Sequence, residues 1–419
     1  MSETVGRRRV VITGMGVLSP LGNTVDEMWT RIVAGDSGIQ RLTLVDPEDY
    51  PCQVGGEVRD FDPTEYMDRK DARRMARFSQ FAVAASRQAV AQAALDLDSI
   101  DRERAGIVCG NGGSGLPESD QAMRTILTRG GSKVDPLYVA KFLSNMAAGN
   151  VSIQLGLLGY TNTVVTACAA GTQAIGDAVE VIRRGHADVM LAGGAEAGIS
   201  ELGLAAFCAM RALTTSFNDR PEASSRPFDR DRDGFAPAEG AGMFVLEELE
   251  HARARGAEPL AEIVGYGVSA DATFLVAPPD DGSGAARAIR AAMADAAIAI
   301  DDVDYISAHA TATDLGDLAE TRAIRTVFGE RAYQIPVSSL KSQIGHLLGA
   351  AGGVETAAIV QTIRTSTIAP TINLDHPGED CDLDYVPHTA RPADVRIAIK
   401  NSFGFGGQNA VLIIRRFEE

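Results

Sequence analysis

Three residues of this 419-residue chain could together form a nucleophilic site: one cysteine and two histidines, each in a turn of small residues. Cys168 stands in TACAAG, between a Thr- and Val-rich run that predicts a buried strand and an apolar pattern with helical spacing. The first N–H groups of a helix have no partner within the helix and carry partial positive charge. We therefore expect a lowered pKa for the Cys168 thiol, and N–H groups that could hold the oxyanion formed during acyl transfer.

The two histidines occupy corresponding places later in the chain. Of six histidines, His309 and His346 lie in the small-residue turns SAHATAT and KSQIGHLLGAA, which mirror the turn of Cys168. A single buried histidine is as often an ordinary core residue, but two in equivalent turns favour a functional site. A cysteine with two histidines supplied from later strands is typical of acyl transfer.

The composition excludes several other classes of function. The chain has 39 basic and 56 acidic residues, a net charge of −17, which argues against nucleic acid or an anionic membrane surface as a partner. The five cysteines are odd in number and widely spaced, which argues against a disulfide framework or a zinc site and fits a reducing cytosol. There is no signal-peptide pattern and no apolar run of membrane-spanning length. We expect a cytoplasmic protein that binds no metal.

The chain repeats one structural unit. TVVTACAAGTQAIGDAVEVI parallels PVSSLKSQIGHLLGAAGGVETAAIV, and PAEGAGMFVLEE parallels FGFGGQNAVLIIRR. This pattern predicts two similar α/β halves, residues 1–255 and 256–419, in which helices cover mostly parallel sheets. Chemistry in such units belongs at the carboxyl ends of the strands. The residues predicted at such ends are Cys168, His309, Lys341, His346 and Phe405.

Four motifs in this order, TACAAG, SAHATATDLGD, KSQIGHLLGAAGGVE and NSFGFGGQN, resemble those of β-ketoacyl-acyl-carrier-protein synthases, most closely the KAS II type. The resemblance runs from RRVVITGMGVLSPLGN to the last predicted strand. It implies the thiolase-like fold, with duplicated halves in a five-layered αβαβα architecture, and a homodimer. It also implies fatty acid elongation by decarboxylative Claisen condensation of an acyl group on Cys168 with malonyl-acyl-carrier protein. No cofactor of the protein's own is implied, because phosphopantetheine arrives on the carrier protein.

The resemblance also implies roles for individual residues. His309 and His346 would donate hydrogen bonds to the malonyl thioester as it loses CO2, while Lys341 would tune the site electrostatically. Two neutral imidazoles can hold an enolate without a metal, and a nearby lysine disfavours their protonation. The N–H groups of Cys168 and Phe405 would form the oxyanion hole. Residues with further implied roles are Thr311 and Thr313 at the pantetheine arm, Phe403 on the glycine-rich loop, and Asp317, Glu320 and Glu355 behind the site.

Four positions depart from the family pattern. Ala310 stands where the family has glycine and could crowd the turn, and Asp314 stands where proline is common. Phe274, near the pantetheine entrance, replaces a histidine of many relatives. Gly113 stands where the KAS II type carries a bulky aliphatic residue in the acyl pocket. We therefore predict a pocket that is more open at Gly113 and accepts long acyl chains.

Docking of an acidic carrier protein onto an acidic enzyme needs a local basic patch. Residues 67–95 predict one long helix with a strongly basic first half. The basic residues of this half are Arg69, Lys70, Arg73, Arg74 and Arg77. The resemblance implies carrier docking through Lys70, Arg73, Arg74 and Arg211; the alternative is a merely solvated helix face.

Three competing functions remain to be weighed. A polyketide ketosynthase subunit would use the same chemistry, and the sequence leaves this alternative open. A thiolase would carry a second cysteine in the C-terminal glycine-rich loop, but NSFGFGG has none. A non-catalytic chain-length partner subunit would lack the nucleophile, whereas Cys168, His309 and His346 are all present.

Overall fold

The largest sheet of the molecule consists of two similar halves placed side by side. The computed structural model describes residues 7–113 and 115–419, and within them this sheet has ten strands. The first half has the order β5 (Thr161–Val164), β4 (Ala105–Gly110), β6 (Val189–Glu196), β7 (Gly240–Glu248) and β1 (Val10–Leu18). The second half has the order β8 (Ala261–Ala270), β14 (Gln408–Arg415), β13 (Ile397–Gly404), β9 (Tyr305–Ser307) and β10 (Val337–Ser338). The halves join where Val11 and Ile12 of β1 pair with Glu262 and Ala261 of β8.

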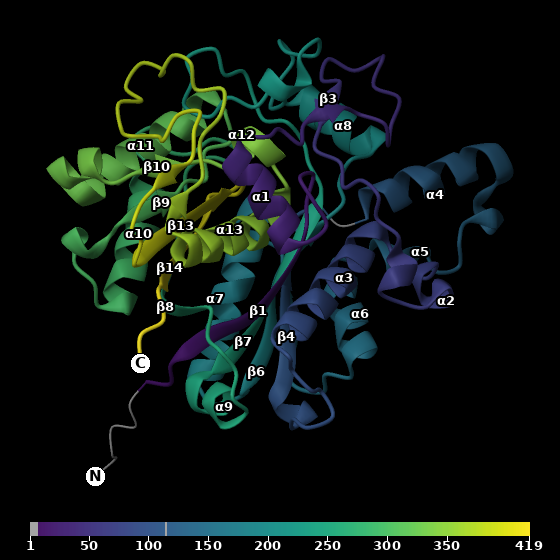
Figure 1. Cartoon of the computed structure of the whole chain (residues 1–419). Helices are drawn as coiled ribbons and strands as arrows, with labels where there is room; N and C mark the ends of the chain where they lie inside the picture. Colours follow the sequence, from purple (N-terminus) through teal and green to yellow (C-terminus); the bar gives the residue numbers. More distant parts are fainter. Residues whose placement is uncertain (1–6, 114) are drawn as a thin grey trace.

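Helices form three layers around these two half-sheets (Figure 1). The central layer contains α7 (Ala170–Arg183) and α13 (Ala351–Thr365), which pack on each other and on strands of both halves. The outer face of the first half is covered by α3 (Arg77–Gln92) and α6 (Met146–Leu155). The outer face of the second half is covered by α10 (Ser283–Ala296) and α11 (Asp314–Phe328). The layers follow the predicted order αβαβα.

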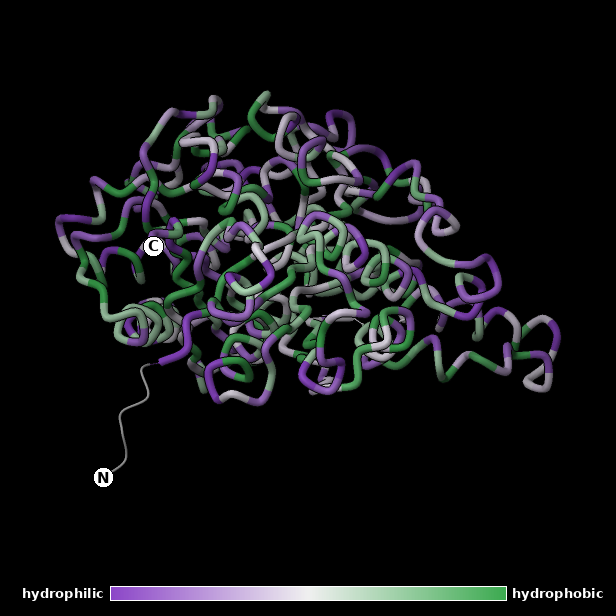
Figure 2. The backbone as a smooth tube through the Cα atoms, turned by 60° about the horizontal axis from the view of Figure 1, so that its bottom comes forward, coloured by the Kyte–Doolittle hydropathy of each residue, from purple (hydrophilic) through white to green (hydrophobic). Residues whose placement is uncertain are grey.

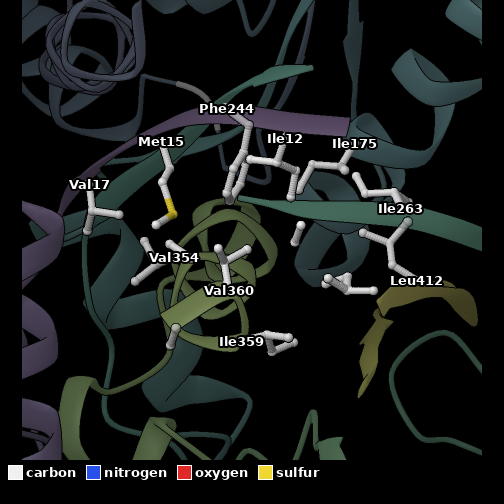
Figure 3. Close-up of a cluster of buried hydrophobic side chains, with 14 of the residues drawn as sticks. Ile12, Met15, Val17, Ile175, Phe244, Ile263, Val354, Ile359, Val360 and Leu412 are labelled. Atoms are coloured by element: carbon white, nitrogen blue, oxygen red, sulfur yellow. The ribbon is translucent and has the colours of Figure 1, made fainter. Parts of the chain in front are cut away.

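The central layer is held by apolar side chains from both halves. Phe244 of the first half and Leu412 of the second lie in one cluster with Ile175 of α7 and Val354 of α13, all fully buried (Figure 3). Burying one such side chain stabilises the fold by about 1.5–3 kcal/mol. Small residues allow the close approach, since a Cβ on Gly353 would lie 2.2 Å from a backbone oxygen of β7. The hydrophobic segments accordingly run through the interior, with hydrophilic loops at the periphery (Figure 2).

The expectation of mostly parallel sheets is wrong, because each half is mixed. In the first half β4 is parallel to β5 and β6, whereas β7 is antiparallel to β6 and β1. The second half repeats this, with β9 parallel to β10 and β13, and β14 antiparallel to β13 and β8. The cause is clear for β13 and β14, since residues 405–407 form a tight turn and a parallel connection needs about a dozen residues or more.

The predicted helix over 67–95 is divided into two. α2 (Arg69–Ala72) ends before a break at residues 73–76, and α3 begins at Arg77. The carbonyl of Ala72 accepts a hydrogen bond from the N–H of Met75 (3.2 Å), within the break, and a second from the side chain of Gln80 on α3 (2.8 Å). Arg77 turns inward to an ion pair of 2.7 Å with the buried Glu239. This contact joins residues far apart in the sequence, so no local pattern could indicate it.

The remaining elements connect the layers. The other helices are α1 (Val25–Ala34), α4 (Leu116–Arg129), α5 (Tyr138–Phe142), α8 (Glu201–Ala209), α9 (Leu249–Ala254) and α12 (Lys341–Ile344). Two small sheets pair β2 (Gln40–Arg41) with β3 (Val54–Gly55) and β11 (Thr367–Ile368) with β12 (Arg391–Pro392). Among the described residues, no helix has the length and apolar character needed to cross a membrane.

Candidate active site

Cys168 lies in a sharp turn between β5 and α7. The turn is a short 3-10 helix, Ala167–Ala169, whose first residue has a φ of 48°. A non-glycine residue seldom adopts this left-handed conformation, which shows how tightly the chain reverses there. Cys168 is only 6% exposed, and the backbone N–H groups of Cys168 and Phe405 lie near its sulfur, where they act to lower the pKa of the thiol. Two backbone donors thus lie beside the sulfur, close to where the oxyanion of an acyl group bound to it would form.

The expected lowering of the Cys168 pKa is wrong. Burial raises the pKa of the thiol to about 12, although Lys341 and the two backbone N–H groups act in the opposite direction. Burial in an apolar environment disfavours the charged thiolate, and here it outweighs the helix N-terminus. The thiol is therefore protonated at neutral pH and needs a base to accept its proton.

His346 lies within reach of that proton. Its Nε2 lies 3.0 Å from Sγ of Cys168. The backbone of His346 is fixed on both sides, since its N–H donates to Ala236 (2.8 Å) and its carbonyl accepts from Ala238 (3.0 Å). The ring of His309, which follows β9, lies edge-on to that of His346 with 5.5 Å between their centres. The nucleophile and both histidines are therefore brought together from three distant segments.

Both imidazoles are neutral at physiological pH. Burial lowers the pKa of His309 and of His346 well below 6.5, and the positive charges of Lys341 and Lys400 lower both further. Within the part of the chain that the structure describes, neither Nδ1 has a hydrogen-bond partner. The protein therefore does not fix which nitrogen of each ring carries the proton.

Two buried lysines lie behind the histidines. Lys341, the first residue of α12, lies with its Nζ 2.5 Å from one oxygen of Glu355 on α13. Lys400 of β13 lies with its Nζ 2.7 Å from the other oxygen. Lys400 was not predicted from the sequence. The pattern IAIKNSF could have indicated it, because a lysine within an apolar strand is buried and therefore needs a partner of opposite charge.

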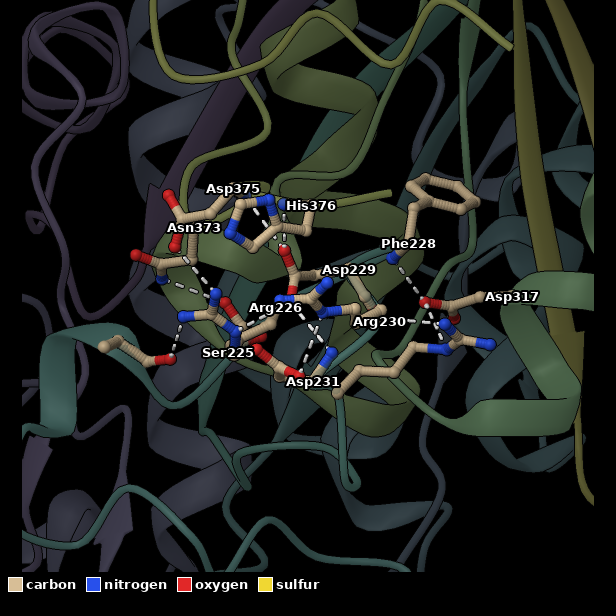
Figure 4. A network of polar contacts seen from close by, with 12 residues as sticks. Ser225, Arg226, Phe228, Asp229, Arg230, Asp231, Asp317, Asn373, Asp375 and His376 are labelled. Carbon is tan, nitrogen blue, oxygen red and sulfur yellow. Dashed lines mark hydrogen bonds and ion pairs between the residues drawn. The ribbon is translucent and has the colours of Figure 1, made fainter. Parts of the chain in front are cut away.

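The carboxylates predicted behind the site hold the loop that carries His309. Glu320 accepts hydrogen bonds from the backbone N–H groups of His309 (2.9 Å) and Ala310 (2.7 Å). Asp317 accepts from Ala312 (3.1 Å) and from Phe228 (2.8 Å). Figure 4 shows the second of these bonds beside a polar network centred on Asp229, Arg226 and Asp375. This network fixes residues 225–232 against residues 373–376.

A cavity of about 340 Å³ opens onto the cysteine and both histidines. Of the predicted substrate residues, Thr311, Thr313 and Phe403 line it, and the hydroxyl oxygens of the two threonines lie 3.1 Å apart. Phe405 and Arg211 also belong to its wall. Gly113 and Phe274 lie outside this wall.

The positions of Gly113 and Phe274 have different causes. Phe274 is 64% exposed, and the nearby Val276 reaches the cavity instead. Gly113 directs its N–H toward the buried carboxylate of Glu196, at 3.1 Å from Oε1. Glu196 also accepts hydrogen bonds from the backbone of Gly112 and Gly349, and burial raises its pKa to about 7. Glu196 was not predicted from the sequence, although it ends the apolar run of β6.

Comparison with known proteins decides the family. The model of the β-ketoacyl synthase N-terminal domain matches residues 7–252, and that of the C-terminal domain matches residues 260–375. The chain belongs to the β-ketoacyl synthase family. It is 46% identical over 412 residues to 3-oxoacyl-acyl-carrier-protein synthase 2 of Synechocystis sp., covering 98% of this chain and 99% of that protein. The predicted family and the predicted enzyme class, an acyltransferase that condenses acyl thioesters, are confirmed.

Solved β-ketoacyl synthase structures confirm the thiolase-like fold. The ishigamide ketosynthase/chain length factor matches with a TM-score of 0.93 and 38% identity, covering 99% of this chain and 100% of that chain. A type II polyketide ketosynthase, solved in complex with its acyl-carrier protein, matches with a TM-score of 0.90 and 35% identity. That match covers 98% of this chain and 100% of the ketosynthase.

Two departures from the β-ketoacyl synthase pattern are accommodated locally. Ala310 does not have a positive φ, and its methyl group lies in a buried apolar cluster, so the expected crowding of the turn is not observed. Asp314 begins α11, where a carboxylate interacts favourably with the helix N-terminus. Its carbonyl accepts a hydrogen bond of 2.8 Å from Arg232.

The predicted docking residues lie on the surface of this β-ketoacyl synthase. Lys70, Arg73, Arg74 and Arg211 are exposed, and none of them forms an ion pair with a residue that the structure describes. Arg77 differs, since its guanidinium forms an ion pair with Glu239. It therefore supports the fold and does not belong to the free basic patch.

Proposed function

We propose that the chain elongates fatty acyl groups on an acyl-carrier protein, with Cys168 as the nucleophile and His309 and His346 as the pair that promotes loss of CO2. The single observation that carries this proposal is that imidazole and backbone N–H groups gather around the Cys168 sulfur. An imidazole nitrogen lies 3.0 Å from it, the backbone N–H groups of Cys168 and Phe405 lie near it, and a second neutral imidazole adjoins the first. A condensing reaction needs these same groups for its two half-reactions.

The first half-reaction transfers the acyl group to Cys168. The sulfur attacks the carbonyl of the acyl thioester while its proton passes to Nε2 of His346, because a thiol with a pKa of about 12 cannot ionise beforehand. The N–H groups of Cys168 and Phe405 hold the oxyanion. The bond to the pantetheine sulfur then breaks, and His346 returns the proton to that sulfur. The products are an acyl-enzyme and a free carrier thiol.

The second half-reaction forms the carbon–carbon bond. His309 and His346 donate N–H groups to the thioester carbonyl of malonyl-carrier protein, so that the bond to the carboxylate breaks and its electron pair forms an enolate and CO2. The enolate carbon attacks the acyl group, the bond to Cys168 breaks, and its sulfur takes up a proton from solvent. Neutral imidazoles suit this role, because each can accept a proton at one step and donate at another. No cofactor of the protein's own takes part.

The cavity is proposed to receive the pantetheine arm of the carrier protein. Thr311 and Thr313 place two hydroxyl groups on its wall, which suits the amides of that arm. Lys70, Arg73 and Arg74 would contact the acidic carrier protein outside, with Arg211 at the cavity. A carrier partner is further supported by the related polyketide ketosynthase, which was solved with its acyl-carrier protein.

Charge reversal tests the docking surface. We expect the double variant Arg73→Glu/Arg74→Glu to raise the KM for acyl-carrier protein about tenfold at low salt, with kcat unchanged. Arg184→Glu, an exposed site beyond the far end of α7, is the control and should leave KM unchanged. An unchanged KM in the double variant at low salt would contradict the docking assignment.

A homodimer is proposed from the apolar surface around β5. This strand is at the edge of the sheet. α6 packs against β5, α5 against α6, and α4 against α5. The exposed apolar residues of this face are Met123, Ile126, Leu127, Val139, Leu143, Ile153, Leu158, Tyr160 and Val165. Pairing of two copies would cover an unpaired strand edge and these side chains.

Light scattering of the pure protein tests the dimer. We expect a dimer for the wild type and a monomer for Leu127→Asp/Ile153→Asp. A monomeric wild type would overturn the homodimer and favour a chain-length partner subunit. Leu275→Asp, exposed on another loop, is the control and should remain dimeric.

We prefer the fatty acid pathway over a polyketide pathway because the sequence identity to a fatty acid synthesis enzyme is higher. The chain is 46% identical to the Synechocystis 3-oxoacyl-acyl-carrier-protein synthase 2, against 38% and 35% for the two ketosynthases above. The cytoplasm is the proposed location, since all five cysteines are free within the described chain.

The decisive experiment supplies acyl-carrier proteins of increasing chain length together with malonyl-carrier protein, and follows the β-ketoacyl product and CO2 by mass spectrometry. We expect one condensation per acyl chain with the wild type and none with Cys168→Ala, whereas the control Cys208→Ala, outside the cavity wall, keeps activity. Repeated condensation into poly-β-keto chains would favour the polyketide alternative. No product and no acylated Cys168 would favour the non-catalytic partner subunit.

A further inference from the structure

Two buried ammonium groups share a single carboxylate directly behind the histidine pair. Nζ of Lys341 is 2.5 Å from Oε1 of Glu355, and Nζ of Lys400 is 2.7 Å from Oε2 of the same group. All three side chains are at most 1% exposed. A buried charge is normally balanced by a partner of opposite sign, because leaving water costs several kcal/mol. This cluster has two cations for one anion.

Lys400 connects three parts of the site through hydrogen bonds. Its Nζ donates to Oγ of Ser402 (3.1 Å) and to the carbonyl of Asn401. Ser402 lies 2.7 Å from Oγ1 of Thr172, in the first turn of the helix that follows the nucleophile. The side chain of Asn401 donates to Glu320 (2.9 Å), which holds the backbone of the His309 loop (residues 308–313).

The titratable groups around the ammonium of Lys400 come from several neighbouring elements. Glu355 on α13 and Glu320 on α11 are negative, whereas Lys341 on α12 is positive. The two histidines are neutral. Burial raises the pKa of Tyr305 on β9, and the nearby charge of Glu355 raises it further. The two half-reactions above use the histidines and assign no step to Lys400.

We propose that Lys400 is a positioning residue of the condensation, whose ammonium completes a cation–carboxylate–cation bridge and places a second positive charge behind His309 and His346. This inference rests on the proposed function, because it assigns Lys400 to the decarboxylating half of that reaction. The bridge fixes Glu355 from both sides, and so fixes Lys341. Its excess positive charge disfavours imidazolium, so the histidines stay neutral when the pH falls and do not stabilise, by ion pairing, the malonyl carboxylate that must leave as CO2.

Replacement of Lys400 by methionine tests the charge while preserving the length of the side chain. In Lys400→Met one cation and one anion remain, so protonation of the histidines becomes easier. We expect the acidic limb of the decarboxylation profile to move up by about one pH unit, which lowers the rate by up to about tenfold at pH values below the limb and changes it less than threefold at pH 8. Acylation of Cys168 at pH 8 and the KM for malonyl-carrier protein should change less than threefold.

Ser402→Ala is the matched control, because it removes a hydrogen bond of Lys400 and keeps its charge. We expect no movement of the acidic limb in this variant. Equal losses of acylation and decarboxylation at every pH in Lys400→Met would show a structural role only and overturn the proposal. An unmoved acidic limb in a folded variant would overturn it as well.

Two further measurements separate this proposal from folding defects and from the proposed function. If Lys400→Met does not fold, Lys400→Ala is assayed with methylammonium, which should restore decarboxylation at low pH, whereas the bulkier tetramethylammonium should not. Rescue by both ions or by neither would overturn the proposal. NMR titration of the imidazole signals needs no turnover, so it tests the charge effect even if the wild type proves inactive as a condensing enzyme. We expect both rings to titrate at higher pH in Lys400→Gln, and unchanged titration would refute the effect.

Discussion

A side chain at position 404 would collide with the turn that carries the nucleophile. A Cβ on Gly404 would lie 2.5 Å from the carbonyl oxygen of Thr166 and 3.2 Å from the backbone nitrogens of Cys168 and Ala169. Ordinary contact begins at 3.4 Å, and contacts under 3.0 Å are essentially never seen. In Gly404→Ala the loop must therefore retreat by at least 3.0 − 2.5 = 0.5 Å, and by 3.4 − 2.5 = 0.9 Å for ordinary contact.

This retreat would remove the N–H group of Phe405, the next residue, from the oxyanion. Donors in an oxyanion hole act at about 2.7–3.1 Å, so a shift of this size lengthens the bond to roughly 3.2–4.0 Å. Loss of one such donor slows the reaction about 10²- to 10³-fold, which corresponds to about 2.7–4 kcal/mol of transition-state stabilisation. We expect the acylation of Cys168 in Gly404→Ala to be slower by about 100-fold.

Acylation is measured by rapid quenching and intact-protein mass spectrometry after mixing with acyl-carrier protein. Decarboxylation of malonyl-carrier protein, which depends on the histidines, should fall less than fivefold. Gly256→Ala is the control: its φ of 73° imposes backbone strain of about 1 kcal/mol, but no atom lies within 4 Å of the new methyl group. An acylation rate within threefold of the wild type in a folded Gly404→Ala would refute the assignment of Phe405 to the oxyanion hole.

The other predictions concern pH, acyl length and stability. Because burial holds the pKa of His309 and His346 below the unfolded value of about 6.5, the unfolded state binds more protons in acid, and stability falls below pH 6.5. Urea unfolding at pH 7.5 and 5.5 should show a loss of about 1 kcal/mol per histidine, absent from a variant with phenylalanine at both positions. Gly113→Ile, outside the cavity wall and with a Cβ that would lie 3.3 Å from a Glu196 oxygen, should leave the ratio of long-chain to short-chain kcat/KM within about threefold, and a roughly tenfold fall would place Gly113 in the acyl pocket as the sequence predicted. Arg77→Ala should cost about 3 kcal/mol by leaving its buried carboxylate partner unpaired, while the KM for carrier protein stays constant; a raised KM would place Arg77 in the docking surface.

Local sequence patterns were sufficient to find the reacting groups. Cys168, His309 and His346 each stand in a run of small residues after an apolar strand, and such runs let a side chain emerge at the end of a sheet. The order of the four motifs gave the family and, with it, the thiolase-like fold. The end of α1 likewise depends on a local residue, since Gly35 adopts a φ of 78° there and glycine tolerates this left-handed conformation. These features depend on neighbouring residues, so they are present in the sequence itself.

Other features depended on contacts between distant residues. The break between α2 and α3 accompanies an ion pair of Arg77 with a residue of a different segment. The antiparallel pairs in each half depend on the path of the chain between strands, such as the tight turn that joins β13 to β14. Phe274 and Gly113 were assigned from motif position, yet neither reaches the cavity around Cys168, because the path of each loop is set by what it packs against.

The sequence by itself determined which residues are present for catalysis, and in which order along the chain they are supplied. Only the tertiary structure decided their electrostatic state. The helix N-terminus favours a thiolate at Cys168, but burial raises its pKa to about 12 and makes His346 necessary. Likewise Lys400 acquires its place only when β13 packs beside Glu355. Burial and charge pairing sum over all neighbours in space, and a linear pattern does not contain that sum.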